Sequence, residues 1–516
     1  MSLSLPTTRP SLPGSADDGA NRSGGRHVLV IGAGLGGLAA AIRLRHQGYR
    51  VTVLERHAVP GGRCGLWESE GFRFDTGPTL LLMIEYLQTL FRDVGRPLEA
   101  YLDLVQLEPN YRVHYADGRT LDVTSRLNRM LQEVERIEPG AGPGLLRFLA
   151  ATSRLYRIGL DGFVDRNVHQ RRDFLSIRNA ALLVRGGAMR RLERMVARFF
   201  RSGELRHTFS FQTLYLGLSP FEAPAIYGLL PYAEVAGGLY FPKGGMHALP
   251  RALARLAAEL GVRIRYRTDV AALERENGRI GAVRFADGTS IPTDLVLANA
   301  DLPYVYRTLL GEPHPRSERF AFSCSAFLMY LGVRGEYPAL PHHTLVVPAD
   351  LRSACGDIFS RHRIPEVPPY YICNPSRTDP SLAPPGCENL YVLVPVPSQA
   401  PGRELDWSVE APRLEQSMLA RLERFGLAGL RDRVVTSRTF TPADFATQLS
   451  AIRGEAFGLA HGLDQVGYLR PHNRHPAYRN LYFVGQSTHP GCGVPMVLIS
   501  ARLVTERMVE EQGVTR

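Results

Sequence analysis

Three glycines and one acidic residue near the amino terminus have the spacing of a dinucleotide-binding turn. Gly32, Gly34 and Gly37 fit the pattern G-x-G-x-x-G, and Glu55 ends the apolar stretch RVTVL that follows them. The first glycine permits a tight turn, the second lets the backbone approach a pyrophosphate, and the third lets a helix pack closely on a strand. The acidic residue is placed to accept hydrogen bonds from a ribose diol. We therefore expect a dinucleotide at this turn, which also contains Ala33.

The residues that follow Glu55 favour FAD over NAD. The stretch ERHAVPGGRC contains Arg56, Gly62 and Arg63. Its backbone and guanidinium groups could cover a second phosphate or the flavin side of a long dinucleotide. The sequence holds no second G-x-G-x-x-G, so a nicotinamide partner has no evident binding site. We expect FAD as the cofactor.

A strand, a helix and a second strand must position these residues. Residues 27–31 form a short apolar run that predicts a strand, and residues 50–54 predict the next one. Between them, residues 38–48 have helical periodicity that ends at a glycine. The acidic residue then falls at the end of the second strand, in register with the glycine turn.

Two later segments look like further parts of the same domain. Residues 246–260 predict an amphipathic helix, and residues 261–301 alternate apolar and polar side chains with Asn-Gly and Asp-Gly turns, which predicts an antiparallel meander. Residues 480–511 predict a buried strand, a glycine-rich turn and a helix. Such insertions are typical of two-dinucleotide-fold flavoproteins.

These segments predict an α/β protein with two domains. A Rossmann-type FAD-binding domain is expected from discontinuous segments, together with an α+β substrate-binding domain. The expected boundaries are a disordered leader over 1–25, the FAD-binding domain over 26–85, 236–302 and 466–516, and the substrate domain over 86–235, with helices that could face a membrane, and over 303–465.

Composition narrows the class of protein further. The net charge of +11 arises from 61 basic and 50 acidic residues without a long run of one sign, and no basic-aromatic module for nucleic acid is visible. The six cysteines lack CxxC spacing, so we expect a reducing cytoplasm and no metal site. No apolar run reaches the roughly 18 residues of a spanning helix, so membrane contact is expected to be peripheral.

The order of the motifs along the chain carries a family resemblance. The sequence resembles the bacterial phytoene desaturase family of FAD-dependent carotenoid desaturases. Besides the glycine turn, the matching stretches are PGGR (60–63), FDTGPT (74–79), FSFQTLYLG (209–217), YFPKGGMHAL (240–249), HHT (342–344), DPSLAPPGC (379–387), RPHNR (470–474) and VGQSTHPGCGVP (484–495).

The resemblance implies both a cofactor site and a reaction. It places Gly485, Val494, Pro495 and the following Met496 against the flavin, and Val270 on the adenosine side of the cofactor. Desaturation takes a hydride to flavin N5 and a proton from the neighbouring carbon of a hydrophobic carotenoid. The neighbouring polyene delocalises the developing charge, so a weak base or water suffices, and placement in a dry tunnel is the main task.

No strong catalytic group is expected. His342, His343 and His489 are weak candidates for moving a proton. Paired histidines before a strand are more often structural, and a histidine in the flavin-side turn more often shapes its loop. Asp75 is expected to support the cofactor loop rather than to act as a base.

The substrate stage is left open by the sequence. Phytoene is the first choice by family frequency. Residues 493–501 read GVPMVLISA where family members commonly read GxPGVxGSA. The bulkier Met496 and Ile499 would narrow the tunnel, which favours a later 3,4-desaturation of a lycopene-type or end-modified carotenoid. A flavin-dependent carotenoid isomerase and a non-catalytic prenyl-lipid carrier are the further alternatives.

One segment could deliver the substrate. Residues 186–203 place apolar side chains at helical spacing among arginines, which is typical of an interfacial helix and equally of a helix facing the core. We expect a cytoplasmic protein at the inner face of the cell membrane, with oxygen or a membrane quinone as electron acceptor.

Overall fold

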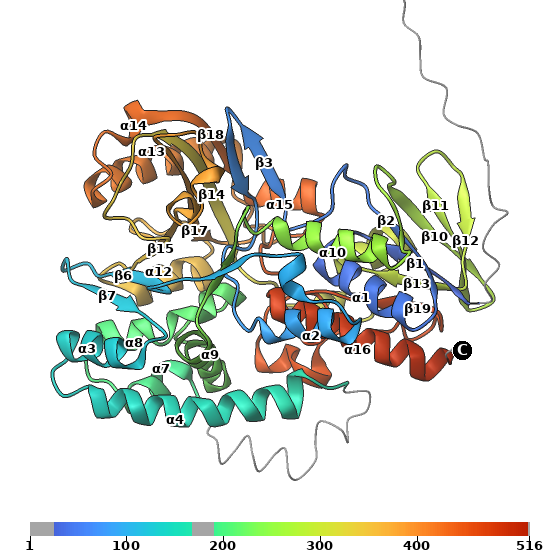
Figure 1. The fold of residues 1–516 in the computed structure, drawn as a ribbon, viewed down its shortest axis with the longest axis horizontal. Coiled ribbons are helices and arrows are strands. Elements are labelled where there is room, and N and C mark those ends of the chain that lie inside the picture. The colour runs from blue at the N-terminus through green and yellow to red at the C-terminus, as the bar shows by residue number, and fades with distance from the viewer. Residues whose placement is uncertain (1–24, 168–189, 514–516) are drawn as a thin grey trace, which may run out of the picture.

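A five-stranded parallel sheet forms one half of the molecule in the computed structural model, which describes residues 25–167 and 190–513 (Figure 1). Its strand order is β19-β13-β1-β2-β9. The strands are β1 (His27–Ile31), β2 (Arg50–Leu54), β9 (Arg263–Arg265), β13 (Leu295–Ala298) and β19 (Leu481–Phe483).

Alternate residues of β1 belong to two different cores, because successive side chains of a strand point to opposite faces. Val28 and Val30 pack against the helices on one face. Leu29 and Ile31 pack with the meander strands on the other. The helices are α1 (Leu35–His46), α10 (Ala248–Glu259) and α16 (Val494–Gln512), and the meander strands are β10 (Val270–Glu276), β11 (Arg279–Phe285) and β12 (Ser290–Pro292).

The predicted elements around the glycine turn are confirmed, with one shift at the helix start. Strands β1 and β2 have the predicted bounds, whereas α1 begins at Leu35 rather than at residue 38. Gly37 in the first turn of α1 allows the helix to pack closely against the end of β1. A Cβ on Gly37 would lie 2.2 Å from the carbonyl oxygen of Gly32, so the helix can begin this close to the strand only without one.

The α/β fold is confirmed. All strands of the parallel sheet fall within the predicted cofactor segments 26–85, 236–302 and 466–516. The domain boundaries themselves stay a prediction.

A seven-stranded mixed sheet forms the other half of the molecule. Its order is β18-β14-β17-β16-β15-β6-β7, and β15 and β6 are its parallel pair. Its strands are β6 (Tyr111–His114), β7 (Thr120–Val123), β14 (Ser325–Arg334), β15 (His343–Val346), β16 (Tyr370–Cys373), β17 (Cys387–Val396) and β18 (Val434–Phe440).

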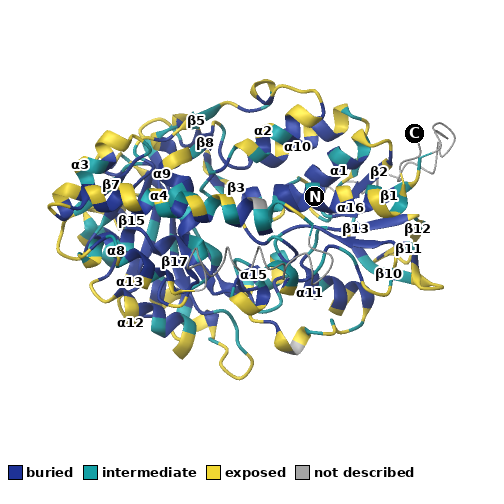
Figure 2. Ribbon diagram, turned by 90° about the horizontal axis from the view of Figure 1, so that it is seen from below, coloured by how far each residue is buried: buried dark blue, intermediate teal, exposed yellow. Residues whose placement is uncertain are grey.

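Short helices and strand pairs surround the two sheets. Buried residues fill the middle of the molecule and exposed residues lie on the outer helices and loops (Figure 2). The strand pairs are β3 (Leu66–Ser69) with β4 (Phe72–Asp75) and β5 (Leu104–Gln106) with β8 (Tyr240–Pro242). The helices are α2 (Glu85–Asp93), α3 (Leu127–Ile137), α4 (Gly142–Gly159), α7 (Leu192–Val196), α8 (Gly203–Thr208), α9 (Leu229–Gly237), α11 (Leu302–Tyr304), α12 (Leu351–Gly356), α13 (Trp407–Phe425), α14 (Leu430–Arg433) and α15 (Pro442–Leu449), besides the 3-10 turn η3 (Phe211–Leu216).

Of the two alternatives for residues 186–203, the described part of that segment favours side chains that face the core over an interfacial helix. Residues 186–189 lie outside the described residues, and beyond them only the short α7 is helical before α8 begins. Leu192, Met195, Val196 and Phe200 are buried in the main core, so no apolar stripe is left for lipid. No helix of the described residues is long and apolar enough to cross a bilayer.

Candidate flavin and substrate site

A cavity of about 750 Å³ lies at the carboxyl ends of the parallel strands and continues into the second half of the molecule. Open α/β sheets bind ligands at this edge. Most of the predicted cofactor residues line it, together with one predicted histidine: Gly32, Gly34, Glu55, Arg56, Gly62, Arg63, Val270, Gly485, His489, Val494, Pro495 and Met496. Ala33, Gly37, His342 and His343 are not among its lining residues.

The glycine turn presents backbone rather than side chains to the cavity. Gly32 has a φ of +98°, a region that residues with a Cβ rarely adopt. A Cβ on Gly34 would come within 2.8 Å of Asn299 Oδ1. Gly34 also begins α1 without a side-chain cap of its own. The N–H of Gly37 donates to Asn299 Oδ1, which leaves the N–H groups of Leu35 and Gly36 in the first turn for an anion.

Glu55 is fixed beside this turn. Its Oε2 accepts a hydrogen bond from the backbone N–H of Ala33 at 2.7 Å, and its Oε1 accepts one from His57 at 2.9 Å. The side chain is buried yet borders the cavity. Each carboxylate oxygen has a further acceptor site, so the group can hold the turn and still bind hydroxyl groups of a ligand.

The segment after Glu55 closes over the turn. The backbone N–H of Gly61 donates to the carbonyl of Ala33 at 3.0 Å. Gly62 has a φ of +56°, and its missing Cβ faces the Cα of Gly34 at 3.6 Å. Arg56 reaches across to Ser450, with its Nη1 3.1 Å from Ser450 Oγ. The loop therefore brings two cationic side chains, those of Arg56 and Arg63, to the cavity.

Asn299 is a cavity residue that the sequence analysis did not identify. It follows the carboxyl end of β13, and its Oδ1 accepts a hydrogen bond from the N–H of Gly37 at 2.9 Å. Its Nδ2 donates to the carbonyl of Val484 at 3.1 Å. One amide therefore ties together segments that lie far apart in the sequence. Its position directly after the apolar run LVLA is the signal that could have revealed it.

Two buried carboxyl groups lie close to the same edge. Asp301 lines the cavity, and its Oδ1 accepts a hydrogen bond from Ser487 while Oδ2 has no partner among the described residues. Burial, followed by the nearby Asp301, raises the pKa of Glu455 to about 8. An unpaired buried acceptor of this kind is a group that a cofactor hydroxyl could satisfy.

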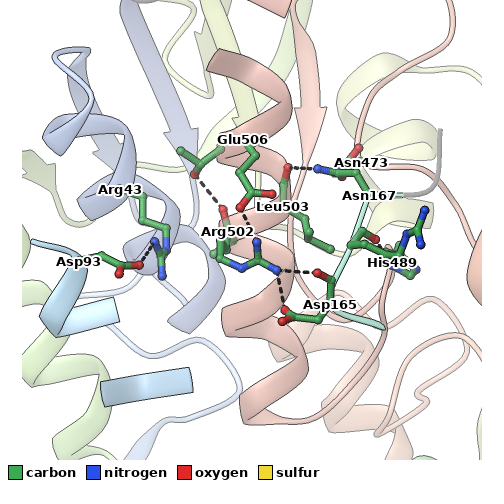
Figure 3. A network of polar contacts seen from close by, with 12 residues as sticks. Arg43, Asp93, Asp165, Asn167, Asn473, His489, Arg502, Leu503 and Glu506 are labelled. Carbon is green, nitrogen blue, oxygen red and sulfur yellow. Dashed lines mark hydrogen bonds and ion pairs between the residues drawn. The ribbon is translucent and has the colours of Figure 1, made fainter. Parts of the chain in front are cut away.

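The flavin-side turn, residues 484–495, and the helix α16 that follows it both contact residues 165–167. Asn167 Nδ2 donates to the carbonyl of Leu503 at 2.9 Å, and Arg502 Nη2 lies 2.5 Å from Asp165 Oδ1 (Figure 3). His489 Nε2 hydrogen bonds the carbonyl of Arg166 at 3.2 Å. Burial lowers the pKa of His489 to about 4. This histidine therefore stays neutral near pH 7 and holds two segments together.

His342 and His343 lie in a separate buried cluster with Cys373. Their side-chain ligand atoms and the thiol lie within 4.8 Å of one another. His342 Nδ1 is 2.6 Å from Thr378 Oγ1, and His343 Nδ1 is 2.7 Å from the hydroxyl of Tyr371. Burial lowers the pKa of both histidines, that of His342 to about 3. The sequence analysis expected no metal site and did not foresee this grouping. The hydrogen bond between His343 and Tyr371 connects this cluster to the cavity, which Tyr371 lines.

Asp75 supports the fold near the cofactor segment. It accepts hydrogen bonds from the N–H groups of Met246 at 2.7 Å and His247 at 2.8 Å. Burial raises its pKa to about 6. The carboxylate thus fixes the start of α10, and it does not line the main cavity.

The remainder of the cavity wall is mainly apolar and comes from many elements. Met496 is part of it, where it packs with Met83 and Leu160, whereas Ile499 is buried behind the wall. The proposed narrowing beside the flavin therefore rests on Met496 alone. Other apolar lining residues are Phe163, Leu214, Ile226, Leu229, Leu230, Ala326, Leu328, Leu345 and Leu393.

A carboxyl group also lies in this wall. Glu234 on α9 is only 1% exposed and lines the cavity. Its Oε2 accepts hydrogen bonds from the hydroxyl of Tyr111 at 2.7 Å and from Gln212 Nε2 at 3.1 Å. Sequence analysis missed it because nothing in the stretch LLPYAEVAG marks the glutamate as facing inward.

The site as a whole fits a flavin dinucleotide. Three features lie along one cavity: a backbone cradle that a Cβ would fill, Glu55 at the end of β2, and an unpaired oxygen of Asp301. That cavity opens into an apolar chamber large enough for part of a long hydrocarbon.

Comparisons with known proteins agree with this architecture. Residues 35–509 match the family of flavin containing amine oxidoreductases. A zeta-carotene-forming phytoene desaturase of Myxococcus xanthus is 46% identical over 95% of this chain and 96% of its own length. A carotenoid 3,4-desaturase of Haloarcula japonica is 37% identical over 94% of this chain and 99% of its own.

A solved structure confirms the fold alone. A putrescine oxidase has a TM-score of 0.62 and 14% identity, and covers 94% of this chain and 99% of its own. The match of residues 35–509 to the family and the identity with the sequence relatives establish that the chain belongs to the flavin-containing amine oxidoreductases and, among them, to the phytoene desaturase family.

Proposed function

We propose that the protein is an FAD-dependent desaturase of acyclic carotenoids. The observation that carries the proposal is the single cavity that joins a dinucleotide cradle to an apolar chamber. The relatives with the highest identity given above are desaturases of carotenoids by name. Phytoene is the first substrate to test.

FAD is favoured over other flavin forms by the nucleotide end of the cavity. Gly32 and Gly34 bring backbone to the cavity, and Arg56 and Arg63 supply positive charge for a diphosphate. Glu55 has acceptor sites for the ribose hydroxyls. When bound, the flavin supplies an acceptor for a hydride. The chain's own residues bind the cofactor, orient the substrate and exclude water.

The apolar chamber suits a substrate without polar handles. Burial of a methylene group is worth roughly 0.8 kcal/mol, so a long polyene favours such a chamber over water. A bilayer is equally apolar, so we infer that the protein receives its substrate at the inner face of the cell membrane from the cytoplasmic side. Oxygen or a membrane quinone would then reoxidise the cofactor.

A later 3,4-desaturation is the second candidate. Met496 lines the cavity. The family pattern GxPGVxGSA has glycine at this position, so we infer that the larger methionine side chain narrows the chamber next to the flavin-side turn. A narrower passage favours a more extended or end-modified carotenoid, such as a lycopene derivative.

Pigment analysis separates these functions. The chain is expressed in cells that accumulate phytoene and in cells that accumulate lycopene or its hydroxylated derivatives, and the products are identified by absorption and mass. Loss of two mass units for each new double bond in the first cells supports phytoene desaturation. Conversion only in the second cells assigns the later step. Products of unchanged mass would show an isomerase and refute the desaturase. Extraction of the bound flavin from the purified protein tests FAD.

A further inference from the structure

Glu234 lies on α9, and its side chain lines the substrate chamber. It lies one helical turn beyond Leu230, on the same helix face, and both residues line the cavity. A glutamate without a cationic partner rarely lies in an apolar wall, because burial of a carboxylate is costly. None of the ion pairs among the described residues includes Glu234. The group therefore needs an explanation beyond packing.

Its two oxygens have different surroundings. Oε2 is held by Tyr111 and Gln212, and Gln212 Nε2 also lies 3.1 Å from the hydroxyl of Tyr111. Oε1 has no hydrogen-bond partner among the described residues. The carboxyl group is thus fixed through one oxygen, while the other is available to a molecule in the chamber.

The groups around Glu234 are uncharged. Tyr111 faces it from β6, and Gln212 and Tyr215 face it from η3. Burial raises the pKa of Glu234 to about 7, and the two hydrogen bonds offset this shift only in part. A carboxyl group with such a pKa can both hold and release a proton near neutral pH, which is the property that a general base requires.

We propose that Glu234 is the base that accepts the proton lost by the substrate when the double bond forms. The inference rests on the proposed desaturase function. One substrate C–H bond breaks, and its electron pair leaves with the hydrogen as a hydride, for which the bound flavin is the oxidant. The neighbouring carbon loses its hydrogen as a proton to Glu234 Oε1. The electron pair of that second C–H bond becomes the new π bond.

The three histidines considered as proton acceptors and two tyrosines near the chamber are less suited to this role. His342 and His343 do not line it, and His489 has one nitrogen engaged with a backbone carbonyl. Burial raises the pKa of the Tyr215 and Tyr371 phenols, which keeps them protonated and poor as bases.

The test is the variant Glu234→Gln in the flavin-loaded full chain, assayed with the carotenoid that the wild type converts. The glutamine retains an oxygen for Tyr111 and can donate to the otherwise unpaired Oε1 of Gln212, so the wall is expected to fold. We expect normal flavin content, a similar KM and a kcat lower by about 100-fold or more. The wild-type kcat should rise with pH through an inflection at or above 7, and the variant should lack that inflection.

Two further variants make the result decisive. Glu234→Asp retains a carboxyl group and should restore part of the rate together with the inflection. Glu222→Gln removes an exposed carboxyl group and should behave as wild type. A Glu234→Gln rate within threefold of wild type, or a slow variant that keeps the inflection, would assign the proton to another acceptor and leave the desaturase function intact. A wild type that forms no new double bond in any carotenoid would refute the function itself.

Discussion

The nucleotide end and the substrate chamber belong to one cavity but are built in different ways. The nucleotide end uses backbone groups, glycines and fixed polar contacts such as that of Glu55 with Ala33. The chamber uses apolar side chains from helices and strands of both halves, interrupted by Glu234. Binding through the backbone constrains residue identity at each position, whereas an apolar wall constrains only volume and polarity. The first region therefore has a motif and the second has none.

Among these variants, Gly37→Ala at the nucleotide end of the cavity should cause the largest loss of flavin content and stability. The new Cβ would meet the Gly32 carbonyl oxygen at 2.2 Å, which forces the helix start away from the strand. Overpacking of this kind costs about 3 kcal/mol. We expect flavin content and thermal stability to fall together, measured by absorbance and calorimetry. Gly237→Ala, where the added Cβ meets nothing within 4 Å, should retain both, and equal losses in the two variants would contradict the packing argument.

Leu230→Gln tests the chamber without touching the cofactor end. The amide would lie in the apolar wall without a partner, at a cost of about 1–3 kcal/mol. We expect kcat/KM for the carotenoid to fall roughly tenfold while flavin content is unchanged. Leu146→Gln, at a side chain that is 47% exposed, is the control. Flavin loss in Leu230→Gln would show that the two regions are not separable.

Glu55→Gln should weaken cofactor binding more modestly. A glutamine can accept from only one of the N–H groups of Ala33 and His57 and turns its own N–H₂ toward the other. A lost hydrogen bond to a charged group is worth about 1.5 kcal/mol, or roughly tenfold in affinity. Titration of the apoprotein with FAD measures the change, with the exposed Glu99→Gln as control. Unchanged affinity would show that the acid does not contribute to the cradle.

His489→Gln should have the smallest effect on turnover. Since burial lowers the pKa of His489 to about 4, the group stays neutral above that pH, and we expect a change of less than threefold rather than the about 100-fold loss of a general base. Between pH 6.5 and pH 4, His489 is protonated in the unfolded chain but stays neutral in the folded chain. The free energy of unfolding of the wild type should therefore decline as the pH falls from 6.5 toward 4. In the His489→Gln variant the free energy of unfolding should decline less over this pH range. Chemical denaturation at each pH measures the difference.

The comparison also explains which residues could be predicted. Gly32, Gly34 and Glu55 are recognisable because the chemistry of a dinucleotide turn fixes both residue type and spacing. Asn299 and Glu234 were missed because one polar residue after a strand or within a short helix has no spacing partner nearby. His342 and His343 were noticed as a pair, but their burial beside Cys373, away from the cavity lining, depends on the pairing of β15 with β16.

Residues 186–203 show that hydrophobic periodicity alone does not distinguish an interfacial helix from a helix that faces the core. Leu192, Met195 and Val196 have the spacing of an amphipathic stripe, and such a stripe is equally suited to lipid or to a protein core. Only the packing of α7 against α8 and the turn Ala225–Gly228 shows that these side chains are buried within the protein.

The sequence by itself determined the flavin class of the cofactor, the α/β fold and the strands of the glycine turn, because each depends on residue patterns within short segments of the chain. Tertiary structure alone decided which side chains enter the chamber and which acids are buried without a partner. Those properties depend on distances between residues that are remote in sequence, and on the removal of water from around them.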